Sequence, residues 1–151
     1  DNFLSFLTAA IDTLLVAQTF CIAAESEGLG ICYLGTTTYN ADKISEILNL
    51  PDYVVPVTTI TLGYPAETPE LTDRIKVGGW VHYEEYKDYD SADIKRVFGY
   101  KDEMEENRKF IKENGKKTLA QVFTDVRYKK ADNEFFSEAF INLLKKKGFL
   151  K

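Results

Sequence analysis

Few residues in the chain could carry out chemistry unaided. A serine, cysteine or threonine nucleophile needs a base, which is most often histidine. The chain has one histidine, His82, and no Gly-x-Ser-x-Gly setting around it. The sequence therefore does not favour a hydrolase. We interpret His82 as a surface or strand-end residue and predict no catalytic side chain.

The carboxylates and thiols do not indicate a metal site. Acidic residues cluster at Glu84-Glu85 and within 103–106, on solvent-facing segments and without calcium-loop or di-iron spacing. Cys21 and Cys32 lack Cys-x-x-Cys spacing and lie in apolar surroundings. We therefore expect no metal, no disulfide framework and a reduced, cytoplasmic protein.

One glycine-rich stretch could be mistaken for a nucleotide loop. Gly28 to Tyr33 begins like a dinucleotide-binding turn, but it lacks the third glycine. It also follows an expected helix, whereas the dinucleotide turn follows a strand and opens a helix. We therefore reject a dinucleotide motif here.

Composition limits the classes of partner. The 151 residues carry 19 Lys and Arg against 24 Asp and Glu, a net charge of -5. The chain thus has no basic footprint for phosphate backbones, and we expect neither nucleic acid nor an anionic membrane as a partner. With 44% hydrophobic residues, the composition is that of a folded globular domain.

The elements that must position any site begin with a long apolar helix. Between Asn2 and Ala24 the only formal charge is Asp12, and neither Lys nor Arg flanks the segment as a membrane or signal segment would require. We predict a helix over 3–27, ended by Gly28 and covered all round by protein. Such a helix in so small a chain suggests a dimer.

The remaining elements follow from turn residues and periodicity. We expect a strand or extended chain at 31–34, a short helix capped by Asn40, and a strand ending at Leu62 that pairs only after Pro56. A loop at 65–74 and a break at Gly78-Gly79 follow. The second half is predicted to be helical from a Ser91 cap to about 97, from 102 to 114, from 118 to 126, and from an Asn133 cap to Gly148.

Read in order, several segments resemble the second half of the FMN-dependent nitroreductases, in the flavin-reductase-like, NADPH-dependent branch of that family. The resemblance covers roughly 12–86, and the final helix from Phe136 is similar to that branch's C-terminal helix. The motifs are Ala23-Ala24-Glu25-Ser26-Glu27-Gly28-Leu29-Gly30-Ile31-Cys32-Tyr33-Leu34-Gly35, Ile47-Leu48-Asn49-Leu50-Pro51, Val54-Val55-Pro56-Val57 and Leu62-Gly63-Tyr64-Pro65-Ala66.

The resemblance implies an α+β sandwich, an antiparallel sheet covered by helices, that forms a homodimer with FMN at the subunit interface. It implies ping-pong transfer of two electrons from NAD(P)H to a small-molecule acceptor, such as a nitroaromatic, a quinone or a flavin. It assigns FMN contacts to the turn Tyr33, Leu34, Gly35 and Thr36, through backbone N–H groups, and to Arg74 at the phosphate. Thr72 stands where that branch often has Lys.

The resemblance also implies that one segment of the family is missing from this chain. The family begins with an Arg-rich segment that is not found here, so 1–151 is expected to be a single, partial domain with a C-terminal helical extension over about 91–151. The alternative to an oxidoreductase is therefore a non-catalytic remnant or dimerisation module that does not retain flavin.

Overall fold

The computed structural model describes residues 2–151, which form two compact units. Of the described residues, unit 1 comprises 2–68 and 133–151, and unit 2 comprises Pro69–Asp132. Unit 2 thus begins at Pro69, before the helical extension expected from about residue 91. Each unit is described by itself below.

Unit 1 begins with α1, Phe3–Ser26, which has no glycine or proline. The helix ends at Gly28, whose φ of 78° places it in the left-handed region that glycine adopts without steric cost. The N–H groups of Gly28 and Leu29 donate to the carbonyls of Glu25 and Ala24, at 3.0 and 3.1 Å. These two bonds form a Schellman ending, so the predicted end of the helix is confirmed.

Most of α1 is exposed in the single chain. Only Cys21 and Ala24 are buried, whereas Leu15 is 64% and Val16 70% exposed. By length and composition the helix could cross a membrane, a test that core helices of soluble proteins and signal sequences also pass. The protein cover that the sequence predicts for this helix is not supplied by the chain itself.

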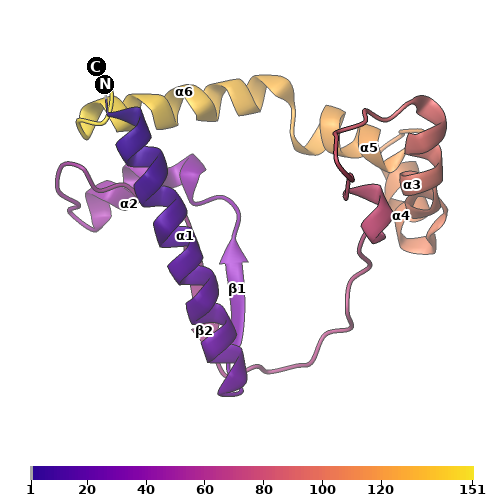
Figure 1. The fold of residues 1–151 in the computed structure, drawn as a ribbon, viewed down its shortest axis with the longest axis horizontal. Helices are drawn as coiled ribbons and strands as arrows, with labels where there is room; N and C mark the ends of the chain where they lie inside the picture. Colours follow the sequence, from indigo (N-terminus) through magenta and orange to yellow (C-terminus); the bar gives the residue numbers. More distant parts are fainter. Residues whose placement is uncertain (1) are drawn as a thin grey trace. The chain divides into compact units, whose positions relative to one another are not determined.

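The strand β1 lies beside α1, and β2 pairs with β1 (Figure 1). β1, Gly30–Leu34, and β2, Thr59–Gly63, pair antiparallel with Gly30 opposite Gly63 and Leu34 opposite Thr59. The β-branched residues of β2 favour this extended backbone, and pairing does begin after Pro56, as predicted. The result is a small two-stranded sheet in an α+β fold.

Between the strands lie the 3-10 turn η1, Thr38–Asn40, and α2, Ala41–Ile47. Asn40 precedes α2 but makes no side-chain cap, since its amide donates to the Thr36 carbonyl at 3.4 Å instead. The capping role predicted for Asn40 is therefore wrong, because the side chain is used to fold the preceding turn.

The last helix, α6, Lys130–Lys146, closes unit 1 with aromatic contacts. Phe6 of α1 contacts Phe140 and Phe149 at ring distances of 6.0 and 5.3 Å, and Tyr39 stacks on Phe136 at 4.2 Å. Leu143 and Leu144 are buried. The two ends of the chain meet here, since the Asn2 N–H donates to the Phe149 carbonyl at 2.7 Å (Figure 1).

Unit 2 contains a 3-10 turn, two regular α-helices, a short α-helix and a π-helical turn. They are η2, Val77–Gly79, α3, Ser91–Glu103, α4, Glu105–Glu113, α5, Leu119–Val122, and the π-helical turn η3, Phe123–Arg127. Val122 is fully buried in this unit. Gly78 and Gly79, where the sequence predicts a break, lie in the 3-10 turn η2.

Three predicted helix starts need correction. Asp90, not Ser91, caps α3, because its carboxylate accepts from the N–H groups of Ala92 and Asp93, both at 2.8 Å. The helix expected from residue 102 starts at Glu105, after a break at Met104 whose ψ is 136°. α6 starts at Lys130, before the predicted Asn133 cap.

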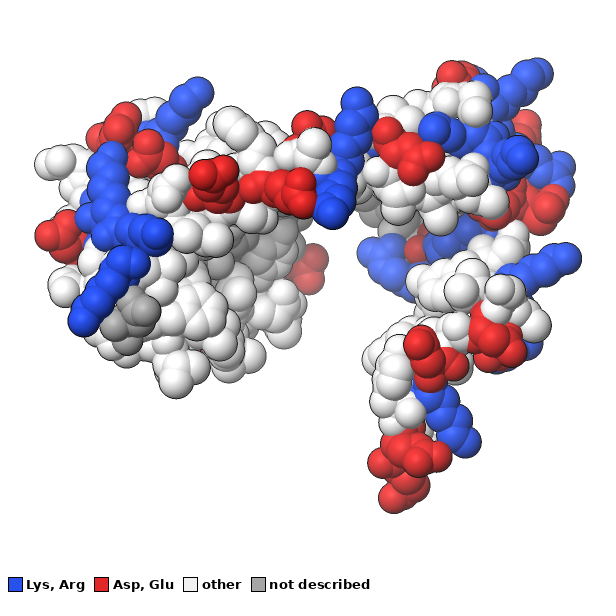
Figure 2. Space-filling model, turned by 90° about the horizontal axis from the view of Figure 1, so that it is seen from above, with Lys and Arg blue, Asp and Glu red and all other residues white. Residues whose placement is uncertain are grey.

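The two units differ in surface charge. Figure 2 shows a largely uncharged face on unit 1, at the left, whereas Lys, Arg, Asp and Glu are interspersed over unit 2, at the right. The helices differ in the same sense, since α4 has six charged residues among its nine and α1 has two among its 24.

Candidate cofactor site

The turn predicted to contact FMN follows directly from β1. Tyr33 and Leu34 are the last residues of the strand, and Gly35 and Thr36 begin the turn toward η1. The buried Thr37 fixes this turn: its hydroxyl lies 3.2 Å from the Leu34 carbonyl and 2.9 Å from the Thr59 hydroxyl of β2. The end of the strand pair is therefore held rigidly.

Two backbone donors at this turn are free. Within residues 2–151, the N–H groups of Gly35 and Thr36 make no hydrogen bond to protein. A methyl group built at Gly35 would meet no atom within 4 Å, so the space beside the backbone is open. Unpaired N–H groups facing open space can bind an acceptor on a ligand, because protein offers them none.

A hollow of about 390 Å³ opens at the same turn. Its lining is mostly apolar and includes hydroxyl and amide groups, the usual character of a small-molecule site. All of its walls belong to unit 1: they are Leu34, Thr36, Thr37, Asn40, Ile44, Ile47, Leu48 and Thr59. The turn, the start of β2 and α2 thus form one concave surface.

The Tyr33 side chain serves a different purpose from its backbone. Its hydroxyl lies 3.3 Å from the Gln18 side-chain oxygen, so the ring is directed toward α1. Hydrogen bonding with the neighbouring Cys21 thiol, followed by burial, raises the pKa of Tyr33. The hydroxyl therefore stays protonated at neutral pH and fastens β1 to α1.

Arg74 lies in unit 2, in the loop before η2. One guanidinium nitrogen, Nη1, donates to the carbonyls of Thr72 and Asp73, both at 3.2 Å, and to the Thr72 hydroxyl. Thr72, in the place where the resembled branch often has Lys, thus contacts the arginine directly. The remaining guanidinium N–H groups can bind an anion in the planar geometry that suits phosphate.

Arg74 is anchored through its neighbour. Asp73 Oδ2 accepts from Lys101 Nζ at 2.5 Å and from the Tyr100 hydroxyl at 2.9 Å, both on α3. These bonds, that from Lys101 first, hold the pKa of the Asp73 carboxyl below its usual value, and the same pair raises the pKa of Lys101. The loop that carries Arg74 is therefore tied to α3.

The structure brings four of the five predicted residues together and leaves Arg74 in the other unit. Sequence reasoning missed Thr37, Asn40 and Thr59, which shape the hollow in unit 1. The run of three threonines after Gly35 is a signal for hydroxyl contacts, but only the strand register reveals Thr59 as their partner. Residues 2–151 hold no group of His, Cys, Asp and Glu that could bind a metal.

Comparison with known proteins identifies relatives of the chain. Residues 5–64 match the model of the nitroreductase family. A Cr(VI) reductase of Pseudomonas sp. is 42% identical over 86 residues, which are 57% of this chain and 35% of the relative. An FMN reductase (NADPH) of Bacillus subtilis is 38% identical over 86 residues, again 57% of this chain and 34% of the relative. The chain thus spans about a third of the length of these curated relatives.

A solved structure extends the similarity along nearly the whole chain. A candidate oxidoreductase of Bacteroides fragilis is 57% identical, with a TM-score of 0.95 over 99% of this chain and 61% of that one. The two units and the small antiparallel sheet are therefore parts of a known α+β fold. Together with the match over residues 5–64, this similarity relates the chain to the nitroreductase family.

Proposed function

We propose that the protein is an FMN-dependent NAD(P)H oxidoreductase that works as a homodimer, with units 1 and 2 belonging to one nitroreductase-like domain. The names of its relatives, a Cr(VI) reductase and an FMN reductase (NADPH), support this class of activity. The observation that carries the proposal is the pair of free N–H groups at Gly35 and Thr36, beside an open hollow.

The residues of unit 1 fit a flavin for a physical reason. The electron-accepting edge of the ring carries nitrogen and oxygen acceptors, and fixed backbone N–H dipoles stabilise the negative charge that reduction places there with little reorganisation. The space beside Gly35 lets the ring edge approach the backbone. Bound FMN would supply two-electron transfer in two half-reactions, from NAD(P)H and then to a nitroaromatic, quinone or flavin acceptor.

The decisive experiment is a visible absorption spectrum of the purified protein, followed by anaerobic addition of NADPH or NADH. Flavin bands that bleach on addition support the proposal. NADPH is the first reductant to test, because the B. subtilis relative is named for it. A colourless protein that also fails to bind added FMN would contradict the proposal and favour a dimerisation module without flavin.

Gly35→Leu tests the backbone site. Since a side chain at Gly35 meets no protein atom within 4 Å and the residue lies outside the left-handed region, the fold should tolerate leucine. The leucine would occupy the space proposed for the flavin, so we expect at least a tenfold rise in the FMN dissociation constant. Gly63→Leu is the matched control: it is equally open, at the opposite end of the strand pair. Equal FMN affinity in both variants would contradict the assignment.

Arg74→Ala tests the proposed phosphate contact. Loss of a guanidinium that forms charge-assisted bonds to phosphate should weaken FMN binding while leaving the fold intact, because Arg74 is exposed. Arg108→Ala removes another exposed arginine of unit 2 and is the control. An unchanged FMN dissociation constant in Arg74→Ala would overturn this contact alone and would leave the backbone site standing.

A cytoplasmic location is part of the proposal. Both cysteines are free thiols in the structure, Cys21 buried and Cys32 exposed. A reducing compartment keeps an exposed thiol unpaired. Fractionation of the native cells, with the protein detected by antibody, tests the location.

A further inference from the structure

A second hollow lies wholly within unit 2, between η2 and α3. Its volume is about 620 Å³, within the range of small-molecule sites. It is lined by Lys76, Gly78, Gly79, Arg96, Val97 and Tyr100, and none of these is acidic. Of these residues, the flavin proposal uses only Tyr100, whose hydroxyl helps to anchor the Arg74 loop.

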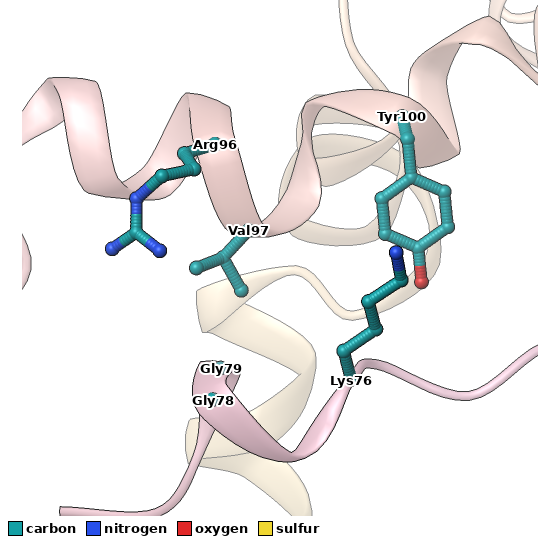
Figure 3. A pocket seen from close by; sticks show the side chains of 6 residues that line it. All are labelled: Lys76, Gly78, Gly79, Arg96, Val97 and Tyr100. Carbon is teal, nitrogen blue, oxygen red and sulfur yellow. The ribbon is translucent and has the colours of Figure 1, made fainter.

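The charges of this hollow are separated by an apolar middle. In Figure 3 Arg96 and Lys76 lie on either side of Val97, and the Lys76 side chain extends toward the Tyr100 ring. The backbone of Gly78 and Gly79 lies across from Val97 in the same view. A ligand in this space would thus meet a cation at each end and hydrocarbon between them.

The nearby carboxylates, Asp93 and Asp73, do not neutralise both Arg96 and Lys76. Asp93 binds Arg96 through Nη2 at 2.7 Å, which leaves the other guanidinium nitrogens for a ligand. Asp73 is engaged by Lys101 and by the Tyr100 hydroxyl, so its charge is already paired. With that hydroxyl bound to Asp73, Tyr100 offers the hollow its ring.

The wall opposite α3 is rigid and requires glycine. A methyl group at Gly79 would lie 2.5 Å from Val97 Cγ1 and 2.7 Å from Ile75 Cγ2, so only glycine permits this close approach. The Gly79 N–H donates to the Lys76 carbonyl at 2.8 Å, and its carbonyl accepts from the Tyr89 hydroxyl at 2.7 Å. A preformed wall lowers the entropic cost of ligand binding.

We propose that this hollow binds a small aromatic dianion, with one acidic group at Arg96, the other at Lys76, and the ring against Val97 and Tyr100. The planar guanidinium suits a carboxylate, and the ammonium suits a point contact. The two proposed ligand-binding cations, Arg96 and Lys76, are not among the proposed flavin contacts, and occupation of the hollow requires neither FMN nor NAD(P)H.

Three isosteric probes test the proposal by their charge. They are terephthalate, a dianion; 4-carbamoylbenzoate, a monoanion; and terephthalamide, which is neutral. Binding to the whole protein is followed by the amide NMR signals of Gly78, Gly79 and Val97. We expect saturable shifts for terephthalate, with affinity falling about two- to fivefold for each charge removed, the size of a solvent-exposed ion pair.

Variants identify the two ends. Arg96→Gln and Lys76→Gln should each weaken terephthalate binding by about two- to fivefold and remove most of its advantage over the monoanion. Lys95→Gln removes a cation from the same helix outside the hollow, and we expect no change. Amide signals far from each substitution should be unaltered, which shows that the variants fold.

Three results would overturn the proposal. The first is equal affinity for terephthalate and terephthalamide. The second is undiminished terephthalate affinity in the double variant with Arg96→Gln and Lys76→Gln. The third is amide shifts confined to the hollow of unit 1, at Thr36 and Thr37. None of these results depends on flavin, so they are separate from a failure of the proposed function.

Discussion

Units 1 and 2 expose different surfaces for different reasons. In unit 1 one helix, α1, carries nine exposed large apolar side chains, while Asp12 and Glu25 are its only charges. In unit 2 several ion pairs lie at the surface, including Lys101 with Asp73 and Lys116 with Asp125. The helix α4 of unit 2 therefore meets water with charges, whereas α1 of unit 1 exposes apolar side chains.

This difference indicates which surface needs to be covered by a partner. Large contiguous apolar patches on soluble proteins mark interaction sites. The hydroxyls of Thr13 and Thr19 do not make α1 more polar, because they donate to the carbonyls of Ala9 and Leu15 at 2.7 and 2.9 Å. A second copy covering α1, as the proposed homodimer requires, would bury this face.

The largest expected effect comes from a charge on α1. Val16 is 70% exposed in the single chain, so Val16→Glu should fold as a monomer. In the dimer the carboxylate would be buried without a partner, which costs several kcal/mol. We expect light scattering after size-exclusion chromatography to show a dimer for the parent protein and a monomer for the variant.

Leu71→Glu is the matched control for that experiment. Leu71 is fully exposed in unit 2, at 100%, but it stands on a loop. If both glutamate variants stay dimeric, α1 does not form the interface. If both become monomeric, the contrast between the units is wrong.

The sequence predicted unit 1 better than unit 2. The end of α1 at Gly28 and the pairing of β2 beyond Pro56 rest on single residues with strong backbone preferences. The turn at Gly35 was found by resemblance. Its hollow was not, because the hollow depends on the pairing of β1 with β2 across 24 intervening residues, including η1 and α2.

Unit 2 was predicted less well because its helix boundaries depend on contacts as well as on local signals. Asp90 outcompetes Ser91 as the cap of α3, since its carboxylate binds two N–H groups at once. The anchoring of Asp73 by α3 joins residues 28 positions apart. The turn at Gly78-Gly79 is set by its packing on Val97, which no local pattern reveals.

An intermediate effect is expected from Gly79→Ala. The added methyl would lie within 2.7 Å of both Val97 and Ile75, so unit 2 must shift at a cost of about 1–3 kcal/mol. Gly78→Ala is the control, because its methyl meets nothing within 4 Å. The free energy of unfolding of both variants is measured by denaturant titration, with the amide NMR signals of α3 as the probe. Equal stability of the two variants would show that the wall beside Val97 is not rigid.

The smallest expected effect concerns the pH dependence of unit 2. Because the pKa of Asp73 is lowered in the folded state, chiefly by Lys101, its ionised form stabilises the fold. That contribution is complete above the unfolded pKa, about 3.9, and is lost as the pH falls through the lower folded value. Asp73→Asn should therefore lower the midpoint temperature of thermal unfolding, followed at α3, by a few degrees at pH 7. The difference from the parent protein should shrink steadily below pH 4.

Glu113→Gln, an exposed change at the end of α4, is the control and should show no such pH dependence. A difference between Asp73→Asn and the parent that persists unchanged at the lowest pH would mean that the side chain acts through packing, and that charge does not fasten the Arg74 loop to α3.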